Sequence, residues 1–307
     1  MKQTHSLHSR MLALGSLSMA FSMISGAFGF FYVKVFLDIY HVEEEWFQIA
    51  QTLFLIWNTL NDPLFAYLQD TTNYRFSRTR RESVLYASPF FALAFVVPWF
   101  PWADPESHRP WVTGCHLIFA LCLWDTMFTY VGLASCCLFT EISRDNANRV
   151  KLIRYTQIGS LFGSSSVLLL QYFSDQLQHF SAFQYTSLFI AFVSFLLMYY
   201  CGKHAHTERE LEDIESPDVK ELFENKDKPT QKYGYFTLAK QIFSNRDFIA
   251  FVVMNFFQEF HKTFLSNFFA IFADQLINKD LLSPLERSLF YGSTAPGAKV
   301  HMFAPDL

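Results

Sequence analysis

Residues 11–33 have the sequence MLALGSLSMAFSMISGAFGFFYV, which contains no charged side chain. A helix rises about 1.5 Å per residue, so this stretch is long enough to cross the roughly 30 Å hydrocarbon core of a bilayer. Because Lys2 and Arg10 precede it, a cleaved secretory signal is the alternative, but the apolar part of a signal usually has about 7–15 residues. The stretch therefore predicts a transmembrane helix.

Similar apolar blocks recur along the chain, with short charged segments between them. Hydrophobic residues make up 51% of the sequence and charged residues only 17%, against roughly 25% charged in soluble domains. Ionisable residues interrupt a few of the blocks, and the last block is the least regular because it contains Glu259, His261, Lys262 and Asp274. We expect six further spans: Trp46–Leu68, Ser83–Phe100, Trp111–Thr140, Leu152–Phe173, Ser181–Cys201 and Phe248–Ile277.

Lysine and arginine alternate from loop to loop in a way that predicts orientation. The segment before the first span and the loops after the second and fourth spans are basic, whereas the loops after the first, third and fifth are poor in basic residues. Basic loops remain on the cytoplasmic side of a membrane. The N-terminus is therefore predicted to be cytoplasmic, in a multi-pass protein that we expect in the plasma membrane.

The charge distribution also predicts how the chain is divided. Residues 202–247 carry both signs of charge together with Pro217 and Pro229, so they indicate a cytoplasmic linker rather than a packed core. We expect a six-helix bundle in residues 1–201, this linker, a seventh helix in residues 248–277 and a polar tail in residues 278–307. This layout, with six helices, a long inner loop and another helix, is typical of a transporter built from two repeats. The tail is interpreted as a truncated or alternative end.

Several functional classes are not expected. The net charge of −4 argues against nucleic-acid binding, which favours a basic surplus. The five cysteines lie in or beside apolar blocks, where they are interpreted as small buried hydrophobic residues rather than disulfide partners or metal ligands. No G-x-S-x-G, P-loop or H-E-x-x-H pattern occurs, so neither an enzyme nor a bound cofactor is predicted.

Residues 57–82, WNTLNDPLFAYLQDTTNYRFSRTRRE, contain the most informative polar pattern. Asp62 lies inside an apolar helix, where a charge costs at least about 2.5–3.5 kcal/mol. Asn58 is four residues earlier on the same face, and Pro63 deprives the Thr59 carbonyl of its usual partner. These oxygens indicate a candidate Na⁺ site at Asn58 and Asp62. The alternative is a carboxylate that is neutral, or hydrogen-bonded to a neighbouring helix, and serves packing.

The runs NDPLFAYLQD and RFSRTRRE resemble the N-D-P-x-x-G-x-x-x-D … R-x-G-R-R pattern of the glycoside-pentoside-hexuronide:cation symporters, a branch of the major facilitator superfamily. The resemblance implies an all-α, major facilitator-type helix bundle that moves a sugar-type solute together with Na⁺ or H⁺. It also implies that Asp62 is a cation-site carboxylate. The chain departs from the pattern at Asn58, where the family has a second aspartate, and at Ala66 and Ser77, which replace glycines.

The same resemblance assigns a structural role to the charged residues that follow. Asp70 with Arg78, Arg80 and Arg81 resembles the inner-loop motif of the superfamily, which braces neighbouring helices in the outward-facing state. An ordinary basic cytoplasmic loop is the alternative. It would explain the arginines but not their fixed offset from Asp70.

Two further ionisable residues lie in apolar sequence: Asp125 in WDTMFTY and Arg154 near the start of the fifth span. The resemblance implies that both contribute to solute binding, and an ion pair between them would lower the cost of burying each. Arg154 could instead extend to the headgroups. Gly159 and Gly163 form a small-xxx-small pair, which predicts close helix packing.

We therefore expect a multi-pass carrier, surrounded by lipid, that uses Asn58, Asp62, Asp125 and Arg154 on an unidentified small solute. The first span has no acidic residue, so a melibiose-like sugar site is not expected. The seven-span form is expected to be inactive alone. One alternative is a transporter-derived scaffold or surface protein. A seven-helix receptor is another, but it conflicts with a cytoplasmic N-terminus.

Overall fold

The computed structural model describes residues 6–71, 79–103, 110–143, 145–174, 177–208, 210–211 and 235–276, and these residues form helices and turns without a strand. The prediction of an all-α helix bundle is confirmed. The chain divides into two units, Met1–Asn225 and Lys226–Leu307, and each is described by itself.

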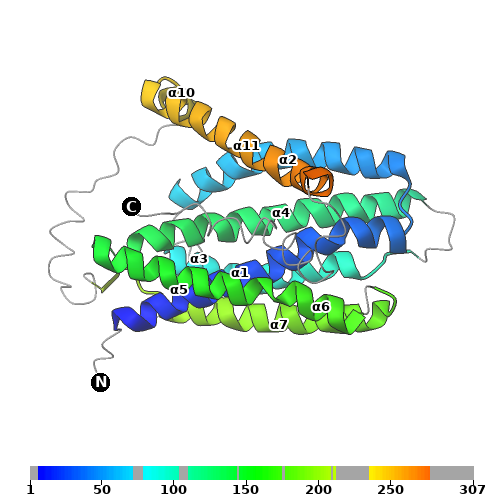
Figure 1. The fold of residues 1–307 in the computed structure, drawn as a ribbon. Coiled ribbons are helices and arrows are strands. Elements are labelled where there is room, and N and C mark those ends of the chain that lie inside the picture. Colours follow the sequence, from blue (N-terminus) through cyan, green and yellow to red (C-terminus); the bar gives the residue numbers. More distant parts are fainter. Residues whose placement is uncertain are drawn as a thin grey trace. The chain divides into compact units, whose positions relative to one another are not determined.

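The described part of every predicted span lies in helices, apart from Phe100 and Ser165 (Figure 1). The first unit contains α1 (Leu7–Lys34), α2 (Glu44–Thr71), α3 (Arg80–Val96), α4 (Pro110–Glu141), α5 (Asn146–Ser164), α6 (Ser166–Ser174) and α7 (Phe180–His204). A π-helical turn, Val35–Ile39, extends α1, and a 3₁₀ turn, Val97–Trp99, extends α3. The second unit contains α10 (Tyr235–Phe243) and α11 (Arg246–Leu276).

Four segments in the described part of the chain are long and apolar enough to cross a membrane, judged by length and composition alone. They are α1 with its π-helical turn, α3 with its 3₁₀ turn, α4 and α7. Their side chains face one another inside the unit and leave large apolar residues on the outside, including Phe30, Phe90, Phe119 and Phe189. An apolar outer surface of this kind requires an apolar surrounding, which lipid provides.

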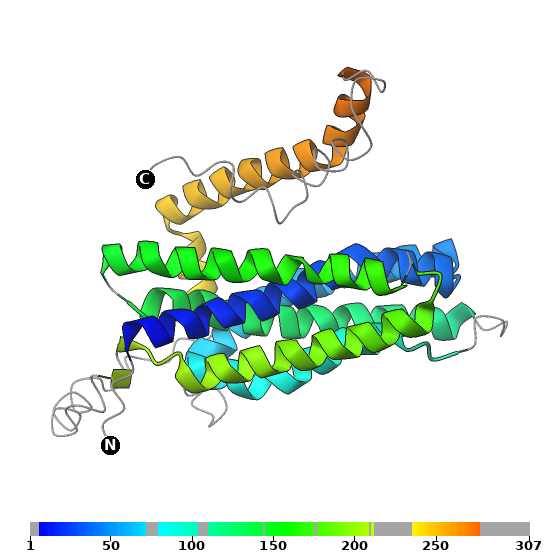
Figure 2. The same cartoon turned by 60° about the horizontal axis from the view of Figure 1, so that its bottom comes forward.

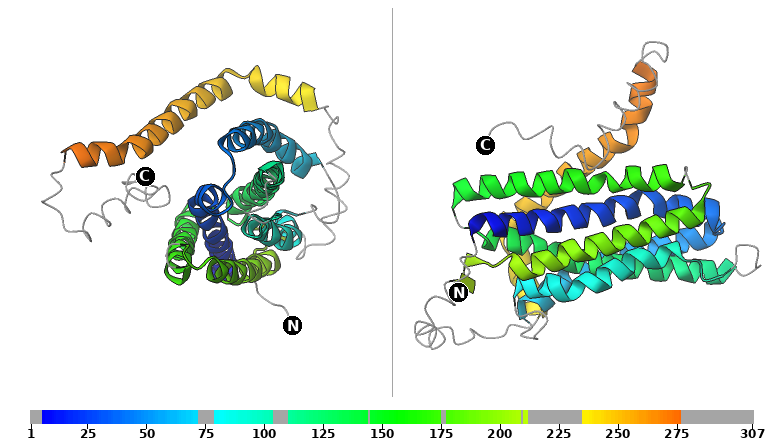
Figure 3. Two further views of the ribbon diagram at one scale, coloured as in Figure 1. Left: turned by 90° about the vertical axis from the view of Figure 1, so that its right-hand side faces the viewer. Right: turned by 90° about the horizontal axis from the view of Figure 1, so that it is seen from below.

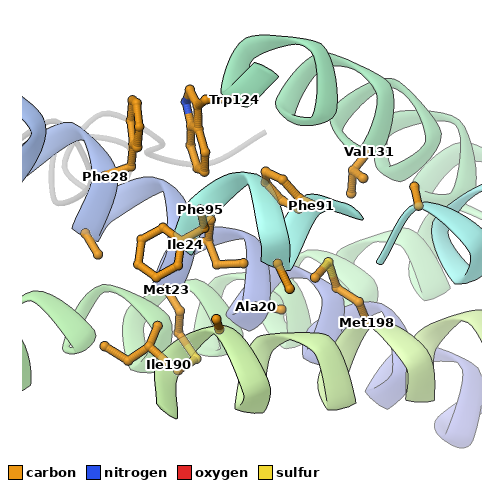
Figure 4. Close-up of a cluster of buried hydrophobic side chains, with 14 of the residues drawn as sticks. Ala20, Met23, Ile24, Phe28, Phe91, Phe95, Trp124, Val131, Ile190 and Met198 are labelled. Carbon is orange, nitrogen blue, oxygen red and sulfur yellow. The ribbon is translucent and has the colours of Figure 1, made fainter. Parts of the chain in front are cut away.

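In the first unit, α1 contacts each of α3, α4, α5, α6 and α7. It packs against α5 and α7, while α3 packs against α4 and α7, and α2 packs against α4 (Figure 3). The buried centre is aromatic: Phe28 of α1 stacks on Trp124 of α4 with ring centroids 4.1 Å apart, and Phe91 and Phe95 of α3 adjoin the same indole (Figure 4). Such pairs add about 0.5–1.5 kcal/mol each beyond the area that they bury.

Glycines allow α1 and α5 to touch through their backbones. A Cβ atom on Gly159 would overlap the carbonyl oxygen of Gly15, and one on Gly163 would overlap that of Met19. The close packing predicted for Gly159 and Gly163 is confirmed.

The fifth span differs from the sequence expectation because it is not one continuous helix. It ends at Ser164 and resumes at Ser166, so α5 and α6 replace a single Leu152–Phe173 span. The Ser164 and Ser165 hydroxyls donate to the carbonyls of Leu161 and Phe162 at 2.9 and 2.6 Å, competing with the regular helical ladder. Ser166 donates to the Met23 carbonyl of α1 at 3.0 Å, which ties the start of α6 to its neighbour.

The seventh span forms one helix in the described residues. Glu259 and His261 do not interrupt α11, which continues to Leu276. Ile277 and the predicted tail, residues 278–307, lie outside the described residues. Within the predicted linker, residues 205–208 and 210–211 are described, and α10 follows at Tyr235. The proposed domain boundaries remain a prediction.

Candidate functional site

The polar residues of α2 and α4 meet in a seam between the two helices, made of Asn58, Asn61, Asp62, Asp125 and Thr129. The Asp125 side chain is buried, with 4% of its surface exposed. Its Oδ1 accepts a hydrogen bond from Asn58 Nδ2 and its Oδ2 accepts one from Asn61 Nδ2, both at 2.9 Å. Both oxygens of this carboxylate are therefore bound by amide groups.

Asp62 belongs to the same seam. Thr129 Oγ1 donates a hydrogen bond to Asp62 Oδ1 at 2.9 Å, one helical turn along α4 from Asp125. The spacing of the residues explains the arrangement, because positions three and four apart share a helix face. The Asp62 side chain is exposed at the surface of the unit, while Asp125 lies deeper.

The seam is richer in acceptors than in donors. Asn61 is fully buried, and within the described residues its Oδ1 accepts no hydrogen bond. Two carboxylates and this amide oxygen thus lie along one helix contact, and among the described residues neither carboxylate forms an ion pair. Carboxylate and amide oxygens are ligands for hard cations. A buried acceptor that receives no hydrogen bond lowers the stability of the folded state by about 1–3 kcal/mol.

Further hydrogen bonds extend this contact in both directions along the helices. Trp57 Nε1 donates to Thr126 Oγ1 at 3.1 Å, and Gln69 Nε2 donates to the Tyr130 carbonyl at 2.8 Å. The seam is therefore held in register from Trp57 to Gln69.

Arg154 lies outside this seam. Its side chain is exposed on α5, and α5 packs against α1 rather than α4. The expected ion pair between Asp125 and Arg154 does not form among the described residues, since the two asparagines occupy the Asp125 carboxylate. The structure thus brings Asn58, Asp62 and Asp125 together and leaves Arg154 apart.

The inner-loop arginines connect the ends of several helices. Arg80 Nη1 donates to Gln69 Oε1 of α2 at 3.3 Å, and its Nε lies 3.9 Å from Glu141 Oε1 of α4. Arg81 Nη1 donates to the Gly202 carbonyl of α7 at 2.7 Å. Arg78 and the side chain of Asp70 lie outside the described residues.

Residues 205–208 and 210–211 after α7, which we call the inner strap, contact Arg81 through Glu210. Arg81 Nε donates to Glu210 Oε2 at 3.3 Å, and His206 Nδ1 lies at the same distance from that oxygen. Burial alone would raise the pKa of Glu210, but contact with His206 and the positive charge of Arg81 outweigh it and hold the pKa below its ordinary value. The buried Arg10 of α1 donates to the carbonyls of Ile142 and His206 at 3.2 and 3.4 Å.

Comparison with known proteins identifies the family. The family model for MFS/sugar transport protein matches residues 13–283, which is most of the chain. The protein belongs to this family. It is similar to transmembrane protein 180 of Gallus gallus, with 30% identity over 86% of this chain and 54% of that protein. It is also similar to transmembrane protein 180 of Mus musculus, with 28% identity over 86% of this chain and 53% of the relative. No solved structure matches.

Membership of the MFS/sugar transport protein family, together with the apolar helices, shows an integral, multi-pass membrane protein of transporter type that contacts the lipid bilayer. The chain spans about half the length of the curated relatives that it matches.

Within this MFS-type bundle, Asn61 and Thr129 are the seam residues that the sequence analysis missed. A usable signal was present, because Asn61 is three residues from Asn58 and Thr129 is four from Asp125. Polar residues at those intervals share a helix face with the predicted ones.

Proposed function

We propose that this protein is a carrier that moves a small, sugar-type solute together with a monovalent cation bound in the α2–α4 seam. The observation that supports it is the buried Asp125 carboxylate, flanked by Asn58 and Asn61 and one turn from Asp62. The family description supports a sugar-type solute. The names of the two similar proteins mention no solute.

The chemistry of the seam favours a cation. A carboxylate inside a membrane is costly, and residues of this kind usually face a bundle interior where a partner neutralises them. Na⁺ would be coordinated by carboxylate oxygens of Asp125 and Asp62 and by the unpartnered Asn61 Oδ1. A proton would neutralise one carboxylate instead and would leave Asn61 without a donor, so Na⁺ accounts for more of the seam.

The solute would bind beside the same seam, which would link its affinity to cation occupancy. Asp62, exposed at the surface of the unit, is the seam carboxylate that a solute could contact. Arg154, exposed on α5, is a second candidate for hydrogen bonds to solute hydroxyl groups. In this proposal the N-terminus is cytoplasmic, as the basic loops favour, and the membrane is taken to be the plasma membrane.

The test is Na⁺ binding by the full chain in lipid nanodiscs. Radioactive Na⁺ binding and the apparent melting temperature would be measured in NaCl and in choline chloride at equal ionic strength. A ligand at about 100 times its Kd stabilises the folded state by about 2.7 kcal/mol, so NaCl should raise the melting temperature. Asp125→Asn and Asp62→Asn should abolish the rise, whereas Asp247→Asn, at the exposed start of α11, should retain it.

Solute movement needs a separate measurement. Uptake of a panel of labelled sugars into proteoliposomes would be compared with and without an inward Na⁺ gradient. Gradient-dependent uptake that Asp125→Asn removes would support the carrier. Na⁺ binding that survives both aspartate changes would contradict the site. Absence of both binding and uptake would contradict the proposal and favour the scaffold alternative, which the replacement of a family aspartate by Asn58 supports.

A further inference from the structure

The short helix α10 has two distinct sides. Its sequence is YFTLAKQIF, and successive residues of a helix are rotated by about 100°. This register places Ile242 and Phe243 on one side, and the polar residues Thr237, Lys240 and Gln241 on the other. A short helix with one apolar and one polar side is typical of a segment that lies along a membrane surface.

A tight turn fixes α10 to the start of α11. The Ser244 and Asn245 amides donate to the carbonyls of Lys240 and Ile242 at 3.0 and 3.1 Å. The Asn245 side chain then accepts from the Asp247 amide at 3.0 Å and caps α11. The rings of Phe243 and Phe248 meet edge to face across the turn, 5.9 Å apart, and the chain bends between the two helices (Figure 2). The last residues of α10 therefore lie close to the first turn of α11.

The beginning of α11 requires an apolar surrounding. In residues 248–254 no side chain is polar, and large side chains on different sides of the helix are exposed, including Ile249, Phe251 and Met254. A helix that is apolar all round is buried in protein or in lipid. In an integral membrane protein, a hydrocarbon core around the start of α11 would meet that requirement, and the turn would then place α10 at the edge of that core.

The charge of α10 complements an anionic surface. Lys240 and Arg246 are exposed, and residues 235–246 contain no acidic residue. At the same end, Ile242 and Phe243 are 45% and 65% exposed, so apolar and basic groups are available together. Basic residues beside an apolar face bind bilayers that contain anionic lipids.

We propose that α10 lies in the headgroup region of the bilayer, with its apolar side toward the acyl chains and with Lys240 and Arg246 bound to anionic lipid headgroups. The occupant of the exposed face is thus the anionic bilayer surface. The assignment depends on the membrane character of the chain and is independent of whether the protein transports a solute.

Hydrogen–deuterium exchange of the full chain in nanodiscs tests this assignment. Exchange in peptides covering residues 235–243 would be compared between discs of phosphatidylcholine and discs that also contain phosphatidylserine. We expect slower exchange in the anionic discs, and high salt should reduce the difference. Because one basic residue near an anionic surface contributes about a fivefold effect, Lys240→Gln should speed the exchange in anionic discs by about fivefold. Lys203→Gln, at the end of α7, is the matched control and should leave α10 unchanged.

A second variant isolates the contribution of the apolar side chains to the protection of α10 from exchange. Phe243→Ser should speed α10 exchange in both kinds of disc, while peptides from α1 and α7 report whether the first unit remains folded. Equal α10 exchange in the two lipid compositions would overturn the proposal. So would protection that persists in Lys240→Gln and at high salt, because it would mean that the apolar side of α10 is covered by protein.

Discussion

Asn61 has the most buried position in the α2–α4 seam, and its two amide atoms are in different situations. Its Nδ2 holds the Asp125 carboxylate, and its Oδ1 accepts no hydrogen bond within the described residues. The side chain therefore contributes to stability through one atom, while the other is available to a ligand. Loss of this residue should affect both folding and cation binding.

We expect Asn61→Leu to lower the apparent melting temperature of the full chain by several degrees. The change leaves Asp125 Oδ2 without its donor, and an unsatisfied buried acceptor costs about 1–3 kcal/mol. Thermal unfolding in detergent, followed by intrinsic fluorescence, measures the effect. Thr59→Ala is the control, because the exposed Thr59 hydroxyl bonds the Leu55 carbonyl of its own helix and, within the described residues, no side chain of another helix. Equal melting temperatures for Asn61→Leu and the wild type would contradict a structural role.

The sequence was sufficient to place Asn58, Asp62 and Asp125 among the candidates, since an ionisable group in an apolar helix is conspicuous. It was not sufficient to pair them. Arg154 is the obvious counter-ion for Asp125 by charge, but α5 packs on α1 and the asparagines of α2 occupy the carboxylate. Which helices adjoin is a property of the tertiary fold that hydropathy along one chain does not contain.

At the scale of helices, the contact between α1 and α5 leaves no room for a side chain at Gly159. A Cβ atom there would overlap the Gly15 carbonyl oxygen, which is backbone and cannot rotate away. Forcing atoms into a packed contact costs about 1–3 kcal/mol. We expect Gly159→Ala to destabilise the bundle by about this amount, measured as a loss of folded monomer in size-exclusion chromatography after heating.

Gly29→Ala is the matched control for this change. It lies in α1, and nothing lies within 4 Å of the position that its Cβ atom would occupy. Alanine favours a helix over glycine by about 1 kcal/mol, so this variant should be as stable as the wild type or more so. An equal loss of folded monomer in Gly159→Ala and Gly29→Ala would mean that a general perturbation of the helix, rather than the close contact, is responsible.

The inner strap should respond to acid through Glu210. Its pKa is below the ordinary value, because contact with His206 and the charge of Arg81 outweigh the opposing effect of burial. Ionised Glu210 therefore stabilises the folded state fully at neutral pH, and this contribution is lost as the pH falls from about 4.3, the ordinary glutamate value, toward the lower folded pKa.

We expect Glu210→Gln to be less stable than the wild type at pH 7, and the difference in melting temperature to shrink below about pH 4. Asp38→Asn, at an exposed position, should show no such convergence. A difference between Glu210→Gln and the wild type that stays constant from pH 7 to pH 3.5 would contradict the role of the ionised carboxylate.

The helices themselves were largely predictable because apolar blocks of about 20 residues have few alternatives in a membrane. The break at Ser165 was not, since the serines of this block could have pointed outward without disturbing the helix. The inner strap was also missed. Its sequence is as charged as that of a linker, but Arg10 bonds its His206 carbonyl and Arg81 bonds its Glu210 carboxylate. The composition of the segment does not indicate these distant partners.

At the scale of the whole molecule, the orientation in the membrane decides which end of the bundle faces the cytoplasm. Arg80, Arg81 and the inner strap lie at the same end of the bundle as the start of α1, because Arg10 bonds the strap. All of these groups should therefore be on the cytoplasmic side.

We expect an epitope tag placed before residue 1 to be inaccessible to antibody in intact cells and accessible after permeabilisation. A cysteine introduced between α3 and α4, at residue 106, should react with an impermeant maleimide from outside, in a chain whose native cysteines are replaced by serine or alanine. The free Cys115 and Cys136 are exposed on the helices, so this replacement is needed. A tag that antibody reaches in intact cells, together with a cysteine at residue 106 that does not react with the maleimide, would contradict the predicted topology.

The contacts of α1 with segments that follow much later in the chain have a consequence for biosynthesis. The backbone that α1 touches at Gly159 is synthesised about 140 residues after Gly15, and the strap carbonyl bonded by Arg10 comes later still. At about 5–20 residues per second, α1 waits roughly 7–40 s for these partners. During that interval the small-residue surface of α1 and the Arg10 guanidinium lack the partners that cover them in the folded unit.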